Sequence, residues 1–362
     1  MEKNKPVVAI CYDFDKTLSP KDMQTFSLLP KLNCPAEEFW AESNEFAKKQ
    51  GVDKILAYMY LILHKAQAAR VRLSEQDFKD MGREIELFSG VEGWFDRIDA
   101  YAEKLGVAVE HYIISAGLKE IISGTAIADK FTEIYASSFI YDEYGAPEWP
   151  RQVVNYTTKT QYLFRISKNS LDLSDEDTVN RYIPDGERRI PFQNFIYIGD
   201  SETDIPAMKI VKNGGGTSVG VYNAKNGDMD RARALLQQRR VDYLLPADYS
   251  EGSILERTVQ SVMRKIGTDE ELGAFNERQL SYAEALGQAE QLKQYIAAAA
   301  SGETAAGLKK YAERFLEGLR KKLRDYDDTV PAEVSERFIS EKKAEVKALI
   351  AEKTEKKAEN RA

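Results

Sequence analysis

The sequence contains little that would hold a small secreted domain together. Its 362 residues include two cysteines, Cys11 and Cys34, too few for a disulfide framework and without the spacing of a zinc site. Cys11 lies in an apolar segment and is interpreted as a core residue. Residues 1–6 lead into a short apolar stretch rather than the apolar region of a signal peptide. We therefore expect a cytoplasmic protein.

Long hydrophobic runs and an excess of positive charge are also missing. The apolar segment at residues 55–63 is too short to cross a bilayer, so no membrane partner is expected. The net charge of −8 argues against a general nucleic-acid or anionic-membrane binder. Hydrophobic residues make up 43% and charged residues 30%, as in soluble globular proteins, and the length indicates more than one domain.

What the sequence does contain is a core-type strand that runs into two acids. Val7–Tyr12 is apolar and rich in β-branched residues, which predicts a buried strand. Asp13 and Asp15 follow at once, and Pro20 ends the element. Two carboxylates at the end of a core strand are costly unless a cation offsets their charge. They indicate a metal site or a site for an anionic substrate.

Strand and helix patterns alternate over residues 90–266. Strands are predicted at 107–115, 131–138, 194–198, 217–221 and 241–245, with a hairpin over 139–156. Helices are predicted at 91–105, 158–167, from about 204, at 224–237 and at 252–266. The helix over 158–167 is expected to begin with a capping box at residues 158–161. This alternation predicts an α/β fold with a doubly wound, mostly parallel sheet and helices on both faces.

Two segments depart from the alternation. Residues 20–89 carry helical patterns at about 35–50, 52–70 and 74–88 and no strand signals. Residues 267–362 are rich in Ala, Glu, Lys and Leu, with apolar residues at helical spacing and an interruption at Pro331. We therefore expect a catalytic core of residues 1–19 and 90–266, a helical cap at 20–89 and a helical C-terminal extension at 267–362.

The extension allows three interpretations. It is a surface for a homodimer, a cover for the core, or an arm that binds a partner. Its helical periodicity lacks long strict heptads, which favours packing on the chain's own core or on a second copy.

Polar residues follow the ends of the predicted strands. Ser115, Asp200 and Asp204 follow two of them, and Lys159 lies at the start of a helix. Ligands of open α/β sheets bind beyond the carboxyl ends of the strands, so these groups can meet Asp13 if their strands are neighbours. Such oxygen ligands suit Mg²⁺. A lysine in the first turn of a helix opposes the helix dipole, which indicates a carboxylate or phosphate partner.

The segment Ser115-Ala116-Gly117 precedes a predicted short helix. Free N–H groups at the N-terminus of a helix bind phosphate, so this segment is a candidate phosphate site.

Four segments resemble, in order, the motifs of the haloacid dehalogenase (HAD) superfamily. They are DFDKTL at residues 13–18, IISAG at 113–117, Lys159, and YIGDSETD at 197–204. The resemblance covers roughly residues 7–266 and implies the family's Rossmann-like core. The acid at Asp15 places the chain in the phosphatase branch, because carbon–halogen cleavage does not need it. The helical insertion corresponds to the family's first type of cap.

The resemblance implies a Mg²⁺-dependent phosphatase that acts on a small phosphorylated metabolite. Asp13 would be the nucleophile that forms an aspartyl-phosphate, and Asp15 would be the general acid and base. Mg²⁺ would be held by Asp13, the Asp15 carbonyl and Asp200, with Asp204 as a ligand or an orienting group. The implied phosphate-binding residues are Thr17, Ser115, Ala116, Gly117 and Lys159.

Phosphoserine phosphatases look like relatives, but they carry acids shortly after the first motif that contact the substrate amine. Lys21 stands in place of an acid here, which argues against phosphoserine. Two alternatives remain open: phosphoryl transfer to an acceptor other than water, and a binding or assembly protein that uses the C-terminal helices.

Each candidate residue also has a structural interpretation. Asp13 and Asp15 could form a solvated turn, Ser115 could only cap a helix, and Asp204 could only be an N-cap. Lys159 could lie on the surface, with Lys168 as the competing candidate. The remaining groups are expected to be structural or to form surface ion pairs: His64, His111, Arg181, Arg188 and Arg189.

Overall fold

The fold was analysed in a computed structural model that describes residues 5–225, 233, 236–299, 304–326, 328 and 330–359. The chain divides into two units, Met1–Gly267 and Thr268–Ala362. Most of the helix predicted at 224–237 lies outside the described residues. Among those that are described, no helix is long and apolar enough to span a bilayer.

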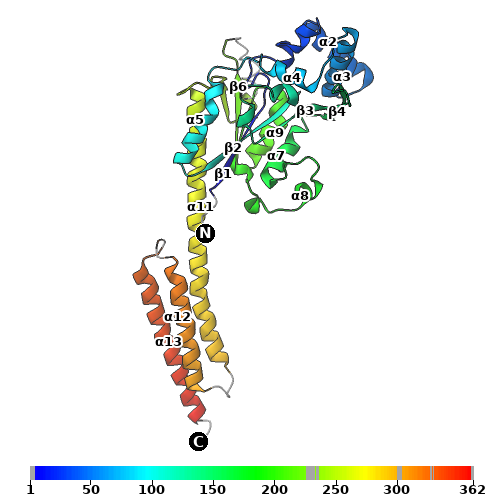
Figure 1. The fold of residues 1–362 in the computed structure, drawn as a ribbon. Helices are drawn as coiled ribbons and strands as arrows, with labels where there is room; N and C mark the ends of the chain where they lie inside the picture. Colours follow the sequence, from blue (N-terminus) through cyan, green and yellow to red (C-terminus); the bar gives the residue numbers. More distant parts are fainter. Residues whose placement is uncertain are drawn as a thin grey trace. The chain divides into compact units, whose positions relative to one another are not determined.

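The first unit is built on a seven-stranded sheet with the order β4-β3-β2-β1-β5-β6-β7 (Figure 1). Every strand pair is parallel except β3 with β4, which confirms the predicted fold class. The strands are β1 Val7–Tyr12, β2 Ala108–Leu118, β3 Glu133–Tyr141, β4 Pro147–Gln152, β5 Phe195–Gly199, β6 Thr217–Tyr222 and β7 Tyr243–Pro246. Because β1 lies between β2 and β5, the carboxyl ends of these three strands meet at one edge.

Alternate residues of β1 are buried on opposite faces of the sheet, which explains why the strand is apolar throughout. Ile10 and Tyr12 belong to a core cluster with residues of α5 and α11. Ala9 and Cys11 belong to a second cluster with residues of α7 and α9. These helices are α5 Val91–Lys104, α7 Lys159–Lys168, α9 Ile205–Asn213 and α11 Ile254–Ala298. Helices therefore cover both faces, as predicted.

A helical insertion follows β1 (Figure 1). Its helices are α1 Leu28–Lys31, α2 Ala36–Gln50, α3 Lys54–Ala68 and α4 Glu75–Gly82. Asp53 caps α3 by accepting a hydrogen bond from the Ile55 N–H at 2.8 Å. The prediction that the last of these helices reaches residue 88 was wrong. Gly82 ends α4 where a Cβ would lie 2.1 Å from the Ile121 carbonyl oxygen, a close backbone contact that only glycine allows.

Three other predicted boundaries were wrong. β2 continues past residue 115 to Leu118, because its pairing with β3 resumes after an irregularity between Ser115 and Leu118. The first strand of the hairpin is β3 itself, which runs without a break from Glu133 into the antiparallel pair with β4. α11 does not stop at residue 266, since Gly267 lies within a continuous helix.

The remaining short elements connect these larger ones. Two are α-helices, α6 Lys119–Ile122 and α8 Glu176–Asn180. Five are 3₁₀ helices: Met23–Thr25, Ala128–Lys130, Asp185–Glu187, Phe192–Asn194 and Glu202–Asp204.

The second unit contains the later part of α11 together with α12 Ala305–Arg324 and α13 Ala332–Glu359. Buried α11 residues recur at alternating spacings of three and four: Tyr282, Ala285, Ala289, Leu292 and Ile296. They pack in two clusters with apolar residues of α12 and α13, such as Leu316 and Val346. This unit has a core of its own, formed by the apolar faces of its helices.

Ending the chain after residue 268 is expected to leave a soluble first unit with its site assembled. Ile266 is the last α11 residue in the cluster that packs on the sheet. Ending it after residue 253 would remove five buried side chains, each contributing about 2 kcal/mol of apolar burial: Leu255, Val259, Val262, Met263 and Ile266. Gel filtration and circular dichroism compare the two fragments. Aggregation of the longer fragment would show that the extension completes the core.

Candidate active site

Asp13 is the first residue after β1, and its carboxylate is buried. Its main-chain N–H donates to the Ile198 carbonyl at 2.9 Å, which continues the pairing of β1 with β5. One carboxylate oxygen accepts from the Phe14 N–H at 2.7 Å, and the other lies 2.8 Å from the Lys159 ammonium. The backbone and a cation therefore fix both oxygens of the carboxylate.

Lys159 is fully buried at the first position of α7. Its ammonium lies 2.8 Å from Asp13 and 2.7 Å from Asp204, so it links two carboxylates. The predicted capping box does not form, because the Thr158 side chain makes no cap hydrogen bond. Instead, the Asn155 side-chain oxygen accepts from the N–H groups of Thr157 and Thr158 at 3.0 and 2.9 Å, which fixes the start of the lysine's helix.

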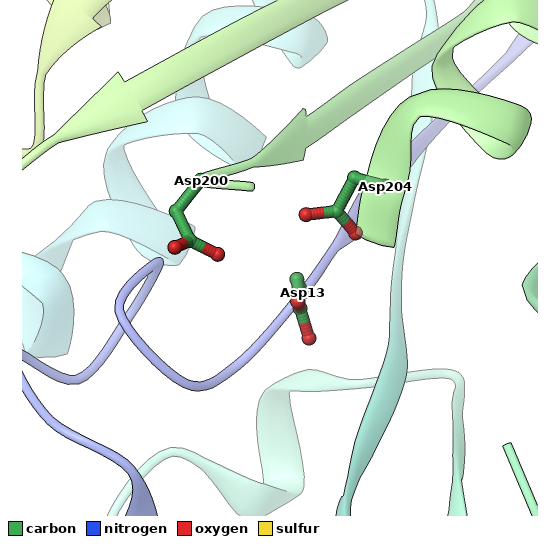
Figure 2. Close-up of side chains that lie close together, drawn as sticks. All are labelled: Asp13, Asp200 and Asp204. Carbon is green, nitrogen blue, oxygen red and sulfur yellow. The ribbon is translucent and has the colours of Figure 1, made fainter. Parts of the chain in front are cut away.

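Asp200 and Asp204 approach Asp13 from the carboxyl end of β5 (Figure 2). One carboxylate oxygen from each of the three lies within 4.8 Å of the others, a spacing that could hold a metal ion. Asp204 accepts from the Tyr197 hydroxyl at 2.8 Å and makes no side-chain cap bond to α9, so its burial is not explained by capping that helix. A Cβ at Gly199 would lie 2.5 Å from this carboxylate, so the approach requires glycine.

Asp15 lies apart from these three carboxylates in the described structure. Its side chain accepts from the Met23 N–H at 2.7 Å, which directs it toward the start of the helical insertion. Lys16 between the two acids adopts a left-handed backbone with φ of 59° and pairs with Asp22 at 2.9 Å. The turn thus sends the carboxylates of Asp13 and Asp15 to different partners.

The candidate phosphate-binding residues adjoin this group. The Thr17 hydroxyl is buried and lacks a hydrogen-bond partner among the described residues. The Ser115 hydroxyl accepts from the Gly117 N–H at 3.1 Å, and the Ala116 carbonyl accepts from Tyr58 of α3 at 2.7 Å. Since β2 runs through these positions, the prediction that they form a helix N-terminus was wrong. Their polar groups come from a strand end instead.

Burial and like charges dominate the electrostatics of the acids. Burial raises the pKa of Asp13 to about 6, although Lys159 acts in the opposite direction. Burial and neighbouring carboxylates also raise the pKa values of Asp15 and Asp200 well above their usual range. Burial disfavours the charge of Lys159, but Asp13 and Asp204 more than offset it, so the pKa of this lysine is raised. The cluster has fewer cations than acids, which favours binding of another cation.

A cavity of about 340 Å³ opens above the acids. The sheet side supplies Asp13, Asp15, Ser115, Gly117 and Asp200, and the helical insertion supplies Trp40, Ser43, Asn44, Lys54, Ile55 and Tyr58. The site is therefore a small chamber between the strand ends and the helices α2 and α3.

The rival candidates lie elsewhere. His111 bonds with Tyr12 and Asp99, each at 3.0 Å, which is a structural role. His64 packs on Tyr60 with ring centroids 4.2 Å apart. Lys168 donates to two main-chain carbonyls, those of residues 179 and 181.

The arginines near the acidic loop form ion pairs. Arg188 pairs with Asp185 at 2.7 Å, and Arg189 pairs with Glu110. Arg181 contributes its main-chain carbonyl to Lys168.

Sequence analysis missed four residues that shape the site. Tyr58 and Met23 contact the strand end and Asp15 from the insertion, Asn155 holds the start of α7, and Tyr197 bonds Asp204. Tyr58 and Tyr197 lie in apolar stretches that look like core. The Asn155-to-Thr158 spacing of an Asx cap was the one signal available.

Buried carboxylates held by a lysine at the switch point of a capped α/β sheet form the kind of site found in an enzyme. The family model for haloacid dehalogenase-like hydrolases matches residues 10–209, and the chain belongs to this family. It is a hydrolase of the HAD type.

Individual relatives are more distant. An uncharacterized protein of Borreliella burgdorferi is 28% identical over 280 residues, covering 70% of this chain and 96% of that protein. A HAD family hydrolase from Salmonella enterica serovar Typhi has 13% identity and a TM-score of 0.45, covering 67% of this chain and 68% of its own. A phospho-aspartyl intermediate analogue of phosphoserine phosphatase has 15% identity and a TM-score of 0.43, covering 71% and 99%.

Proposed function

We propose that the protein is a Mg²⁺-dependent phosphatase that hydrolyses a small phosphomonoester through an aspartyl-phosphate at Asp13. The observation that carries the proposal is the position of Asp13 at the wall of the cavity, with one oxygen held by Lys159 at 2.8 Å. The buried ammonium orients the carboxylate and offers positive charge beside the point where phosphorus would be attacked.

The reaction divides between the two acids of the first motif. The Asp13 carboxylate attacks phosphorus while the bond to the leaving oxygen breaks, and Asp15 gives that oxygen a proton. Water then attacks phosphorus, Asp15 accepts a proton from it, and phosphate leaves as Asp13 is restored. The separate contacts of the two side chains, Asp13 with Lys159 and Asp15 with Met23, support this division.

The strand ends supply groups for the phosphoryl oxygens. The unpartnered hydroxyl of Thr17 and the hydroxyl of Ser115 are buried beside Asp13, and Gly117 leaves room next to Asp15. With Lys159 they would bind charge as it develops on the transferring group. The Thr17 hydroxyl is the clearest case, since a buried hydroxyl without a partner is unfavourable until it binds something.

The acidic cluster fits Mg²⁺. Asp13 and Asp200 supply carboxylate oxygens, and the Asp15 carbonyl would complete the protein ligands. Asp204 already binds Lys159 and Tyr197, so we assign it mainly to orientation of the lysine. Bound Mg²⁺ would supply positive charge that lets a phosphate dianion approach these carboxylates.

The helical insertion would act as the cap. It lines the cavity with α2 and α3, and the cavity suits a small metabolite rather than a polymer such as nucleic acid. Both cysteines are free, which fits the reducing cytoplasm. The C-terminal helices at 267–362 are retained as a candidate dimer surface, with their own core leaving the outer faces available.

Chelation tests the metal assignment. Hydrolysis of 4-nitrophenyl phosphate is expected to stop with EDTA and to return with excess Mg²⁺, because the three clustered carboxylates repel a phosphate dianion without a cation. Release of nitrophenol is followed at constant ionic strength. Calcium serves as the control ion, since it prefers a larger and less regular ligand shell. Activity that persists through chelation would remove Mg²⁺ from the proposal.

A further inference from the structure

The wall of the cavity contributed by the cap carries a single charged side chain, Lys54. The other lining residues of this wall are neutral: Trp40, Ser43, Asn44, Ile55 and Tyr58. The catalytic wall carries the acids, so the two walls differ in charge. A substrate that fills the cavity would place its phosphate against the strand ends and its leaving group against the cap.

Lys54 has no acidic partner within ion-pair distance in the described part of the chain. The adjacent carboxylate, Asp53, is used elsewhere. One of its oxygens accepts from the Ile55 N–H at 2.8 Å, and the other accepts from the Asn155 side-chain amide at 2.9 Å. The ammonium is therefore left to pair with something that enters the cavity.

The position of Lys54 in its helix points the same way. It is the first residue of α3, a helix of 15 residues, where the helix dipole is positive. A cation is unfavourable at this end, and an anion bound beside it is favoured both by the dipole and by the ammonium. The first turn of α3 lines the cavity through Lys54 and Ile55, so such an anion would lie inside it.

The cavity offers no comparable site for an ammonium group among its described residues. Apart from the catalytic acids Asp13, Asp15 and Asp200, Asp22 is the lining acid, and it pairs with Lys16 at 2.9 Å. A positively charged leaving group would meet Lys54 without an unpaired acid to offset it.

We infer that Lys54 selects substrates whose leaving group carries a carboxylate, so that the preferred class is the phosphorylated hydroxy acids. This inference rests on the proposed phosphatase function and adds the identity of the leaving group. Ser43 and Asn44 on the same wall are suited to the hydroxyl groups of such a compound.

Three compounds of one size test this selection. 3-Phosphoglycerate carries a hydroxyl and a carboxylate, glycerol 3-phosphate replaces the carboxylate by a hydroxymethyl group, and phosphoserine replaces the hydroxyl by an ammonium. The ratio of kcat/KM for 3-phosphoglycerate to that for glycerol 3-phosphate is expected to be about tenfold, the value of one charge-assisted contact. Phosphoserine should fall below 3-phosphoglycerate.

Variants assign the preference to the side chain. Lys54→Gln is expected to bring the ratio close to one, and Lys54→Arg to keep most of it. Lys49→Gln, an exposed lysine of α2 outside the cavity, is the matched control and should leave the ratio unchanged. An unchanged ratio in Lys54→Gln, or a wild-type ratio near one, would overturn the inference.

Calorimetry on Asp13→Asn separates this inference from the proposed function. The same compounds are titrated in Mg²⁺, so binding is measured whether or not turnover occurs. A carboxylate preference that disappears with Lys54→Gln supports the inference even if wild-type protein fails to hydrolyse 4-nitrophenyl phosphate, a failure that would count against the phosphatase function alone. Equal binding of 3-phosphoglycerate and glycerol 3-phosphate would contradict it.

Discussion

Replacing Asp13 with asparagine is expected to reduce phosphatase turnover by a factor of about 10⁴ or more, as for loss of a nucleophile in other enzymes. The amide cannot attack phosphorus, and it also removes one of the two carboxylates that hold Lys159. The fold should persist, because Lys159 keeps Asp204 at 2.7 Å. Turnover of 4-nitrophenyl phosphate and thermal unfolding are measured on the same preparation.

The intermediate itself can be observed. Wild-type protein mixed with ³²P-labelled substrate and quenched in acid should retain label that hydroxylamine releases, as an acyl phosphate does, and Asp13→Asn should retain none. Asp96→Asn is the matched control, because that exposed aspartate pairs only with Lys130 on the surface of the same unit. Near-normal rates in Asp13→Asn would make another residue the nucleophile.

The sheet and the convergence of the acids could be predicted from the sequence because both depend on local patterns. Val7–Tyr12 is apolar at every position, which marks a central strand, and parallel strands bring their carboxyl ends to one edge. Asp13 and Asp200 follow β1 and β5 directly. Once these strands are neighbours, the two acids must lie close together.

What could not be predicted depends on contacts between distant segments. Tyr58 reads as one apolar position of α3, and only the folded cap brings its hydroxyl to the Ala116 carbonyl. β2 was ended too early because Ser115 and Gly117 are poor strand formers, whereas pairing with β3 holds them in place. Gly267 was expected to end a helix, but a single glycine costs only about 1 kcal/mol, which the packing on either side outweighs.

Lys159→Met is expected to lower both activity and stability, the latter by about 3 kcal/mol, because it leaves the buried carboxylates of Asp13 and Asp204 without their cation. Activity should fall by about 10³, the cost of losing a preorganised charge. Unfolding by urea is followed in EDTA, so that a metal ion does not replace the ammonium. Lys168→Met is the control, since that lysine bonds only main-chain carbonyls in the described structure.

A double variant separates the structural role of Lys159 from its chemical role. In Lys159→Met/Asp204→Asn one of the two buried charges is removed along with the ammonium, and the oxygen of the new side-chain amide could still accept from the Tyr197 hydroxyl. Part of the lost stability should therefore return, because fewer charges remain buried without compensation. Activity should not return, since no cation lies beside Asp13. Recovery of activity together with stability would mean that Lys159 serves only to balance charge, and the phosphoryl contact assigned to it would have to be withdrawn.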